Sequence, residues 1–411
     1  MLKRLRIRNY KCLRDLTLDI PAFNVIVGKN DTGKTSFLEA VHHLAQFVGP
    51  RPPQLGGAWS VKNLITHDAV ESSLSWEAQI DARSSQTEGV ADVSYRLEVG
   101  PHLDSESSSR IVDECLHAPA EDLFVKRVTV PPPPIPVHPR PDPLTEVSDG
   151  QSRARLGASG QTALAWIRDQ PGFARLKQVS HGLSSTRLYR LDPRVLGTPA
   201  IFKTGPNNKV LEPRLSRDGD GLPLVLDLMS GAQRAAFDEV ERELRSFSPN
   251  IRSIALRTQA LEGGLGKTLS FVLADGREAP AGLMSDGVLL FLTFLTLVHG
   301  PSTPSIVLVE EPENGMHPHA LKQVVSVLKR LTDPNRVARP IQVMLTTHSP
   351  YLLDFVPPES VAIFGRNESG DCTAKRLVEI PGVMDRLAAG FSLGEMWFNT
   401  GEDQLLSLGS K

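Results

Sequence analysis

Cysteine is scarce in this sequence. The 411 residues hold three cysteines, Cys12, Cys115 and Cys372, which lie far apart along the chain. They form neither the paired spacing of a zinc site nor the dense pattern of a disulfide-stapled secreted domain. The sequence therefore excludes those two classes and suits a reducing compartment, so we expect a cytoplasmic protein.

Excess charge and long hydrophobic runs are also missing. The net charge is −2, so nothing global indicates a nucleic-acid or membrane partner. The longest apolar run, residues 288–298, is interrupted by Thr293 and Thr296. It is too short to cross a bilayer, which predicts a buried helix and no membrane partner. The basic start, residues 1–8, lacks the apolar stretch of a signal peptide.

A phosphate-binding motif is present at Gly28–Thr35, which matches G-x-x-x-x-G-K-[ST] in full. An apolar run at residues 23–27 precedes it, and apolar residues at helical spacing follow it, so the motif lies between a strand and a helix as it must. Lys34 is expected to contact the β- and γ-phosphates, and the Thr35 hydroxyl to ligate Mg²⁺. The predicted nucleotide-binding residues here are Gly28, Lys29, Asn30, Asp31, Thr32, Gly33, Lys34, Thr35 and Ser36.

A second Gly-Lys-Thr, Gly266–Thr268, fails the same test. The motif needs a glycine five residues before Gly266, and Leu261 stands there. We therefore interpret this segment as a turn. The Asp218-Gly-Asp220 segment is likewise interpreted as a turn.

Acidic residues follow a second apolar strand at residues 306–309. Glu310 is placed to hold Mg²⁺, directly or through water, and Glu311 to orient an attacking water molecule. A further apolar run at residues 341–345 ends in Thr347 and His348, which therefore lie where open α/β sheets bind ligands. Upstream, Ser285-Asp286-Gly287 opens the apolar helix, where a hydroxyl and free N–H groups can meet a phosphate.

The spacing of these motifs divides the chain into four expected segments. Residues 1–115 form the N-terminal part of a head with the P-loop, and residues 116–150 a proline-rich loop containing the proline run 131–143. Residues 151–250 form a helical insertion, and residues 251–411 the C-terminal part of the head. Within the insertion, i,i+4 ion pairs are expected for Asp238 with Arg242 and for Glu241 with Arg245.

Taken together, the motifs resemble those of the ABC class of ATPases: the P-loop as Walker A, Ser285–Gly287 as signature, Glu310–Glu313 as Walker B, Asn314-Gly315 as D-loop and His348 as switch histidine. Residues 5–11 and 307–318 resemble the RecF/SMC-like branch, and more closely the AAA ATPases allied to the OLD family. Residues 189–193, 215–219 and 392–395 are similar to that family's linking segments.

The resemblance implies an α/β fold, an ABC-type head with a mixed sheet core, an antiparallel N-terminal sheet and a helical insertion. It implies a homodimer or higher oligomer arranged head to tail around two molecules of ATP and their Mg²⁺. Ser285, Asp286 and Gly287 then bind the partner's nucleotide, while Lys34, Glu311 and His348 serve hydrolysis. Lys11 is expected near the nucleotide.

The sequence departs from the family pattern in four places. Glu310 stands where Asp is usual, which predicts slow hydrolysis. Asp31 replaces a frequent glycine, and a turn accommodates it because Asp tolerates the left-handed conformation. No Q-loop glutamine is identified, with Gln79 the nearest candidate. The residues after His348 leave little room for a Toprim nuclease domain, so none is expected.

Three functions remain open. The first is a nucleotide-gated switch that controls a separate effector, such as a nuclease, in bacterial antiphage defence. The second is a RecF-like DNA-binding ATPase in repair or replication, with the basic residues between Lys3 and Arg14 touching DNA phosphates or forming a solvated strand face. The third is the ATPase subunit of a transporter, which the terse signature and the insertion disfavour.

Overall fold

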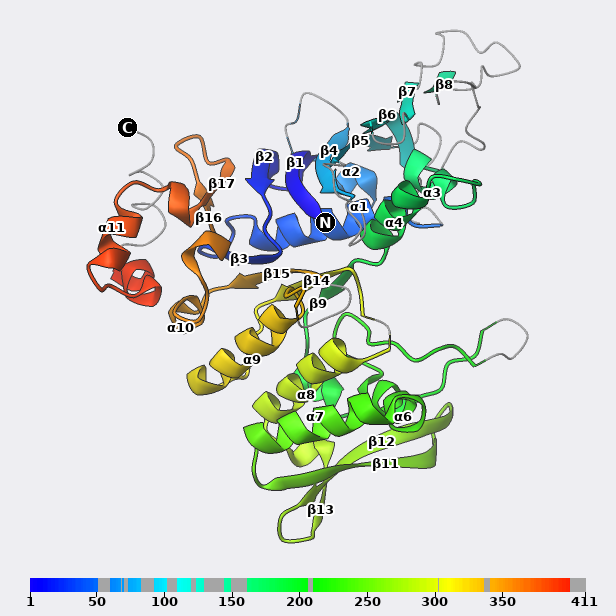
Figure 1. Ribbon diagram of the computed structural model, residues 1–411, viewed down its shortest axis with the longest axis vertical. Coiled ribbons are helices and arrows are strands. Elements are labelled where there is room, and N and C mark those ends of the chain that lie inside the picture. Colours follow the sequence, from blue (N-terminus) through cyan, green and yellow to red (C-terminus); the bar gives the residue numbers. More distant parts are fainter. Residues whose placement is uncertain are drawn as a thin grey trace. The chain divides into compact units, whose positions relative to one another are not determined.

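The computed structural model describes residues 1–50, 60–67, 69, 73–82, 92–101, 109–119, 123–128, 144–148, 161–205, 210–301, 303–335 and 341–399. The chain divides into two compact units (Figure 1). Unit 1 comprises residues 1–186, 358–391 and 399–411, and unit 2 comprises residues 187–357 and 392–398. The proline run at 131–143 lies outside the described residues.

A seven-stranded antiparallel sheet dominates unit 1. Its strand order is β2-β1-β4-β5-β6-β7-β8. Alternate residues of the first strands are buried, as expected for strands with one face on a core. The strands are β1 (Leu2–Tyr10), β2 (Leu13–Asp19), β4 (Leu74–Asp81), β5 (Asp92–Pro101), β6 (Ser109–Ala118), β7 (Leu123–Val128) and β8 (Leu144–Ser148).

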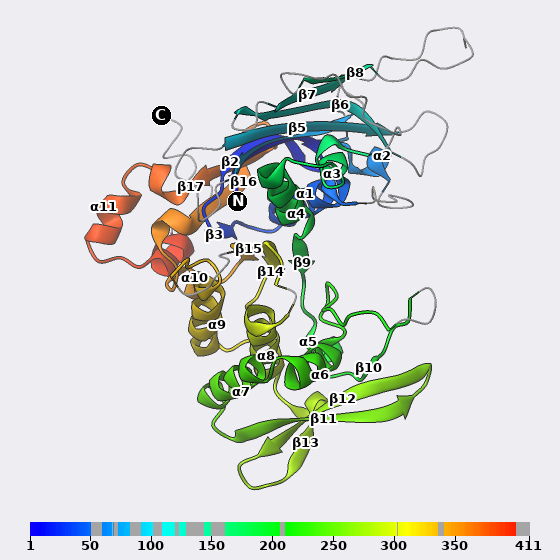
Figure 2. The ribbon, with the colours of Figure 1, turned by 45° about the vertical axis from the view of Figure 1, so that its right-hand side comes forward.

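Helices α1 (Lys34–Val48), α3 (Ala163–Ile167) and α4 (Ala174–Ser184) lie together on one side of this sheet (Figure 2). The buried Trp76 of β4 fixes α1 there, because its indole Nε1 donates a 3.0 Å hydrogen bond to the carbonyl of Ala40. Tyr10 and His43 add a buried 2.8 Å contact between β1 and α1. The sheet therefore holds the helix that begins inside the phosphate-binding motif.

Unit 1 also contains a small set of mixed strands. The fully buried β3 (Phe23–Val27) pairs in parallel with β16 (Val361–Arg366), which pairs antiparallel with β17 (Cys372–Arg376). These strands and the antiparallel sheet confirm the predicted fold class. The remaining elements are α2 (Val61–Leu64), α11 (Val383–Ala388) and 3₁₀ turns at Pro358–Ser360 and Leu377–Glu379.

Unit 2 contains parallel strands and a separate antiparallel sheet. The buried β14 (Ile306–Glu310) pairs in parallel with β15 (Gln342–Thr347) and with β9 (Arg187–Tyr189). The antiparallel sheet has the order β10-β12-β11, with β13 also on β12. Its strands are β10 (Ala200–Ile201), β11 (Ile251–Leu261), β12 (Gly264–Leu273) and β13 (Glu278–Pro280).

Helices α6 (Leu222–Ala232) and α7 (Arg234–Phe247) cover one face of that antiparallel sheet, next to α8 (Asp286–His299) (Figures 1 and 2). The apolar α8 is buried from Val288 to Leu297, as its sequence predicts. Among the described residues, no helix is both long enough and apolar enough to span a bilayer. The other helical elements are α5 (Pro193–Leu196), α9 (Pro318–Arg330), α10 (Pro350–Leu353) and a 3₁₀ turn at Ala281–Leu283.

The structure divides the chain differently from the four segments expected from the sequence. The segment 116–150 holds β7 and β8, and the described part of 151–250 is shared between the two units. Sequence pattern missed this because β7 and β8 are short and flank the prolines. The second Gly-Lys-Thr, interpreted as a turn, is instead part of strand β12, and the turn that joins β11 to β12 precedes it at residues 262–263. Residues 217–218 do form a turn.

The ion pairs expected within α7 are wrong. Asp238 pairs with Arg234 at 2.9 Å, while Arg242 pairs with Glu239 one turn earlier. Glu241 instead accepts a 2.7 Å hydrogen bond from the backbone N–H of Ile254 in β11. The Glu241 carboxylate therefore joins α7 to the sheet instead of forming an ion pair along the helix.

Candidate functional site

The phosphate-binding loop joins β3 to α1 in unit 1 and is tightly packed at its first glycine. A Cβ on Gly28 would lie 2.4 Å from the carbonyl oxygen of Phe364 and 2.7 Å from the hydroxyl of Thr32. Gly33, with φ of 92°, caps the N-terminus of α1 in the left-handed conformation. The backbone path therefore requires glycine at both positions.

Lys34 is buried at the start of α1, and its ammonium group is held by the loop itself. Nζ donates to the carbonyls of Gly28 at 2.7 Å and Lys29 at 2.6 Å. Thr32 donates a 2.9 Å hydrogen bond to the same Lys29 carbonyl. The next residue, Thr35, is exposed on the first turn of the helix. The loop thus presents a cation and a hydroxyl at one helix N-terminus.

Arg366, at the end of β16, clamps the tip of the loop. Its guanidinium donates to the Asp31 carbonyl at 2.7 Å and to the Asp31 carboxylate at 2.9 Å. Asp31 has φ of 64°, so it adopts the left-handed conformation that the sequence predicts for it. Sequence reasoning missed Arg366, because the topology alone brings β16 beside β3.

Lys11, which is predicted to lie near the nucleotide, forms an ion pair with an acid on α1. Lys11 Nζ lies 2.5 Å from the Glu39 carboxylate on α1. Gln79, the nearest Q-loop candidate, is exposed on β4.

In unit 2, Glu310 ends β14 with its side chain only 4% exposed, and two arginines face it. Arg217 Nη2 donates to Glu310 Oε1 at 2.8 Å, and Arg190 Nε lies 3.7 Å from Oε2. Both arginines come from the linking segments, which are joined to each other by a 2.8 Å backbone hydrogen bond from Arg190 to Arg217. The predicted metal role of Glu310 stays a prediction, and these guanidinium groups compete with it.

The next residue is Glu311. Neighbouring side chains contact both oxygens of its carboxylate, and its backbone is in the left-handed conformation. His348 Nε2 lies 3.1 Å from Oε1, and Asn314 Nδ2 donates to Oε2 at 2.8 Å. Its φ of 46° is left-handed, which is strained for a residue with a side chain. A 3.1 Å hydrogen bond from its N–H to the Thr346 carbonyl anchors it beside β15. The structure thus brings together the predicted Walker B acid, D-loop and switch histidine.

Glu313 holds the segment that contains the predicted switch histidine, His348, through two hydrogen bonds. Its Oε1 accepts hydrogen bonds from the Thr347 hydroxyl at 2.7 Å and from the His348 backbone N–H at 2.8 Å. The sequence showed Glu313 as part of the acidic run, but gave no sign of this contact.

The predicted signature lies next to the D-loop in the same unit. Ser285 is the exposed N-cap residue of the 14-residue helix α8. Gly315, with φ of 83°, packs on the start of that helix: a Cβ there would lie 3.1 Å from Cβ of Asp286. Gly287 follows in the first turn. The Walker B, D-loop, switch and signature residues therefore gather in unit 2, and the P-loop in unit 1.

The basic residues near the N-terminus are paired with acids. Arg6 donates to Asp15 at 2.8 and 2.6 Å, and this hydrogen bond raises the pKa of Arg6 and lowers that of Asp15. The other basic residues also form ion pairs, in order Lys3 with Asp92, Arg4 with Asp19, Arg8 with Glu77, Lys11 with Glu39 and Arg14 with Asp371. Arg4 and Arg6 line a groove of about 640 Å³ on the seven-stranded sheet, together with Glu77 and Asp113. Arg96 and Lys126 also line the groove, so this strand face carries both signs of charge, with more basic than acidic side chains along the groove.

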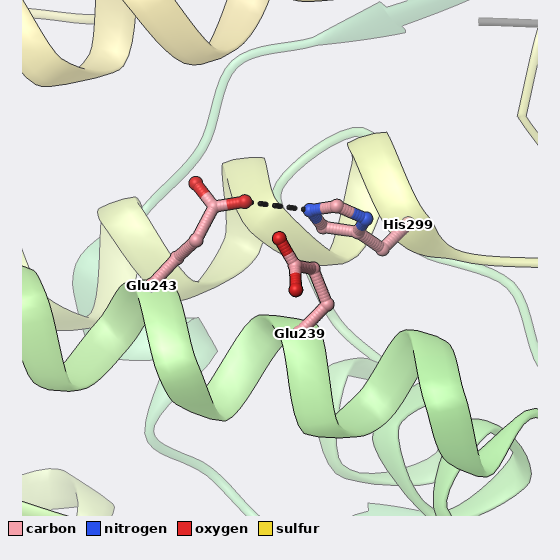
Figure 3. A group of neighbouring side chains, drawn as sticks. All are labelled: Glu239, Glu243 and His299. Carbon is pink, nitrogen blue, oxygen red and sulfur yellow. Dashed lines mark hydrogen bonds and ion pairs between the residues drawn. The ribbon is translucent and has the colours of Figure 1, made fainter. Parts of the chain in front are cut away.

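One group of side chains away from these motifs has metal-ligand chemistry. Glu239 and Glu243 project from α7 toward His299 at the end of α8, with ligand atoms within 4.8 Å of one another (Figure 3). Both carboxylates are already paired, Glu239 with Arg242 and Glu243 with Arg330 at 2.5 Å. Burial raises the pKa of Glu243, but hydrogen bonds from His299 and Arg330 outweigh it and lower the value to about 2. We interpret the group as an ion-pair network joining α7, α8 and α9.

Comparison with known proteins gives the family. The model of the family described as "AAA domain, putative AbiEii toxin, Type IV TA system" matches residues 23–354. The chain belongs to this AAA family. The match begins with the P-loop strand β3 and ends after His348, so it includes the predicted Walker A, signature, Walker B, D-loop and switch residues, while residues 5–11 and 392–395 lie outside it.

Individual relatives of this AAA protein agree with that assignment. A 50-residue segment is 42% identical to the OLD nuclease of Thermus scotoductus, covering 12% of this chain and 10% of the nuclease. The crystal structure of the SmcHead bound to the C-winged helix domain of ScpA matches with a TM-score of 0.50 and 12% identity, covering 91% of this chain and 97% of that one. An Smc head with an extended coiled coil, bound to the C-terminal domain of ScpA derived from Pyrococcus furiosus, has a TM-score of 0.49 and 11% identity, over 94% and 98%. The match to the SmcHead shows that the AAA protein has the fold of an ATPase head of this kind.

Proposed function

We propose that this protein is a Mg²⁺-dependent ATP hydrolase that works as a nucleotide-gated dimeric switch. The observation that carries the proposal is the arrangement of Glu311. Its carboxylate is held on one oxygen by His348 and on the other by Asn314, from a strained backbone. A carboxylate fixed in this way suits the orientation of a water molecule, which is the task of the Walker B glutamate.

The P-loop fits a nucleoside triphosphate. Gly28 and Gly33 allow the loop to pack closely on the protein, because a Cβ on either would meet protein atoms. Helix α1 directs its N-terminal N–H groups and the positive end of its dipole at the loop. Lys34 Nζ already rests on two loop carbonyls, so a phosphate replaces these as its partner. ATP is therefore the proposed ligand.

Of the two residues proposed to hold Mg²⁺, Thr35 suits the ion better than Glu310. Thr35 offers an exposed hydroxyl, which is a suitable oxygen ligand. Glu310 offers a carboxylate whose oxygens face Arg217 and Arg190. The ion, when bound, neutralises charge on the phosphates.

Hydrolysis then divides among this chain's residues. Lys34 holds the phosphates, Glu311 orients the attacking water and accepts its proton, and His348 contacts the γ-phosphate while keeping Glu311 in place. Glu313 keeps His348 at its position through the backbone N–H. ATP binding is thereby assigned to Lys34 and water activation to Glu311. Substitutions of these two residues should therefore affect ATP affinity and turnover separately.

A second copy of the chain is proposed to complete each site. Ser285 is exposed at the N-terminus of α8, where its hydroxyl and the free N–H groups of the first turn can meet a phosphate bound to another protomer. Asp286 and Gly287 share that turn. ATP would thus stabilise a head-to-tail dimer with two nucleotides between the protomers.

The output is proposed to be control of a separate effector protein, such as a nuclease, in antiphage defence. The family description names a toxin of a toxin–antitoxin system, and the matched segment comes from a nuclease. The similar SmcHead was solved bound to a domain of another protein. ATP-driven closure of the dimer would give such a partner different affinities for the open and closed states. Because the N-terminal arginines are paired with acids, a RecF-like DNA-binding role receives no support from them.

The test uses the two Gly-Lys-Thr segments of the chain. Lys34→Ala is compared with Lys267→Ala, whose lysine pairs with Asp227 at 2.6 Å and belongs to the hairpin. Lys34→Ala should abolish ATP binding and turnover, while Lys267→Ala should retain both. Equal effects of the two changes would contradict the P-loop assignment. Plasmid cleavage by the purified wild-type chain with ATP and Mg²⁺, lost on a point change in the chain, would contradict the separate effector.

A further inference from the structure

Two cysteines from opposite ends of the sequence meet at the P-loop. Cys12 lies in the turn between β1 and β2, and Cys372 is the first residue of β17. A Cβ on Gly33 would lie 3.2 Å from Sγ of Cys12 and 3.0 Å from Sγ of Cys372. Both sulfurs therefore lie beside Gly33, next to the space that a side chain at this position would occupy. The spacing in the sequence predicted no such pair.

The surroundings of the two thiols give them different roles. Cys372 donates a hydrogen bond to Cys12; this contact lowers the pKa of the Cys12 thiol to about 6 and raises the pKa of Cys372. Burial opposes the shift at Cys12, while the Ser36 hydroxyl, 3.5 Å away, and the charge of Arg366 add to it. Cys12 is partly exposed and Cys372 is buried. Cys12 is thus a reachable thiolate at neutral pH, with a second thiol behind it.

The third cysteine provides a contrast within the same chain. Cys115 lies on β6, and its pKa is raised, first by burial and then by the nearby carboxylate of Asp113. A thiol with a raised pKa is a poor nucleophile at neutral pH, because the thiolate is the reactive form.

We propose that Cys12 and Cys372 are a reversible oxidation site, at which hydrogen peroxide links the two sulfurs into a disulfide and so switches off the adjacent P-loop. The Cys12 thiolate attacks one peroxide oxygen, forming a sulfenic acid and releasing hydroxide. The Cys372 thiol then attacks the sulfenic sulfur, and the S–O bond breaks as the S–S bond forms. Overall two thiols lose two electrons and two protons, and one peroxide becomes two waters. A dithiol reductant reverses the reaction by thiol–disulfide exchange.

The effect on the P-loop follows from the length of the new bond. A disulfide requires a sulfur–sulfur distance of about 2.05 Å, shorter than the contact of two thiols, so forming the bond draws Cys12 in the β1–β2 turn and Cys372 at the start of β17 together beside Gly33. Both sulfurs lie beside Gly33, where an added Cβ would come within 3.2 Å of each, and Gly33 caps the helix that carries Lys34. A displacement of about 1 Å at a phosphate site lowers kcat/KM by up to about 100-fold, and we expect a loss of about 10- to 100-fold here. This consequence rests on the proposed ATP hydrolysis, whereas the formation of the disulfide does not.

The experiment treats the reduced full-length protein with hydrogen peroxide and blocks remaining thiols by alkylation. Peptide mass spectrometry then looks for the Cys12–Cys372 linked peptide, while ATP turnover and nucleotide binding are measured on the same samples. We expect the linked peptide to appear, turnover to fall about 10- to 100-fold, and dithiothreitol to restore it. Cys115→Ser should behave like the wild type. Cys12→Ser and Cys372→Ser should keep their turnover in peroxide.

Two results would overturn the proposal. One is the absence of the linked peptide while Cys12 is alkylated normally or oxidised to sulfinic acid. The other is an equal loss of turnover in Cys12→Ser, Cys372→Ser and the wild type. A reduced wild-type protein that hydrolyses no ATP would contradict the proposed function instead, and the linked peptide would still decide the oxidation site. If Cys12→Ser fails to fold, two other measurements replace it: the turnover of Cys372→Ser in peroxide, and the rate at which Cys12 of the wild type is alkylated.

Discussion

The contact between Glu310 and Arg217 can be tested as a stabilising ion pair, apart from any role in metal binding. Glu310→Gln removes the charge and keeps the shape of the side chain, and Arg217→Met keeps the apolar stem of the arginine. Because Glu310 is buried and receives a 2.8 Å hydrogen bond from Arg217, either change removes the charge–charge part of this contact, while Arg190 remains 3.7 Å from Glu310 Oε2. The two changes should therefore be coupled in their effect on stability.

The magnitude follows from the burial of the pair. Breaking a fully buried ion pair costs about 3–5 kcal/mol, and an exposed pair contributes about 0–1 kcal/mol. Here one partner is 4% and the other 42% exposed, so the pair lies between these limits. We expect a coupling free energy of about 2 kcal/mol in a double-mutant cycle. In a unit of this size about 1 kcal/mol shifts Tm by 2–4 °C, so each single change should lower Tm by about 4–8 °C.

The assay is thermal unfolding without nucleotide and without divalent metal, so that the ion pair acts alone. The double variant should be about as stable as the less stable single variant. Arg194→Met is the control, since Arg194 is 90% exposed and pairs only with its neighbour Asp192 in the described structure. Strictly additive effects of the two changes would refute the reasoning. A loss of stability that appears only when Mg²⁺ is added would assign Glu310 to the metal instead.

Three further predictions concern the loop, the switch and the dimer. Gly28→Ala should abolish ATP binding in an equilibrium binding assay, because the added Cβ would lie 2.4 Å from a backbone carbonyl; normal binding would contradict the described loop. Glu313→Ala should lower turnover by about 10-fold or more with ATP affinity kept, since it removes the oxygen that accepts from Thr347 and His348 and a misplaced catalytic group costs rate; an unchanged rate would exclude Glu313 from the positioning of His348. Mixing Lys34→Ala with Ser285→Arg protomers should restore turnover, because each heterodimer keeps one intact composite site; heterodimers without recovery would contradict the trans arrangement.

Local sequence was sufficient for features that depend on neighbouring residues. The strand, glycine turn and helix around Lys34 lie where the motif predicts them. Asp31 adopts the left-handed conformation that its residue type permits. The same holds for the apolar helix that follows Gly287 and for the strand that ends at Glu310. In each case the periodicity and the turn residues stand within a few positions of one another.

Contacts between residues far apart in the sequence could not be predicted, because the pairing of the strands brings these residues together. Arg366 reaches Asp31 because β16 pairs with β3, and Cys372 approaches Cys12 because β17 follows β16. No local pattern marks such pairs. The division into units differs for the same reason, since contacts between distant segments define a compact unit.

Charge pairs on helices show a second limit of sequence reasoning. Spacing alone allowed Glu241 to pair with Arg245, yet Glu241 accepts from the backbone of β11 and Arg245 donates to the carbonyl of Arg252. A partner in another element wins because a docked, partly buried hydrogen bond is stronger than an exposed i,i+4 pair.

The most direct test of the proposed function is ATP turnover by Glu311→Gln. This change keeps the size of the side chain and the amide can still contact His348 and Asn314, but it removes the base that activates water. We predict that kcat falls by at least about 100-fold while ATP binding is retained. Glu278→Gln, which alters an exposed glutamate paired with Arg257, should leave turnover unchanged. Wild-type turnover by Glu311→Gln would contradict the account.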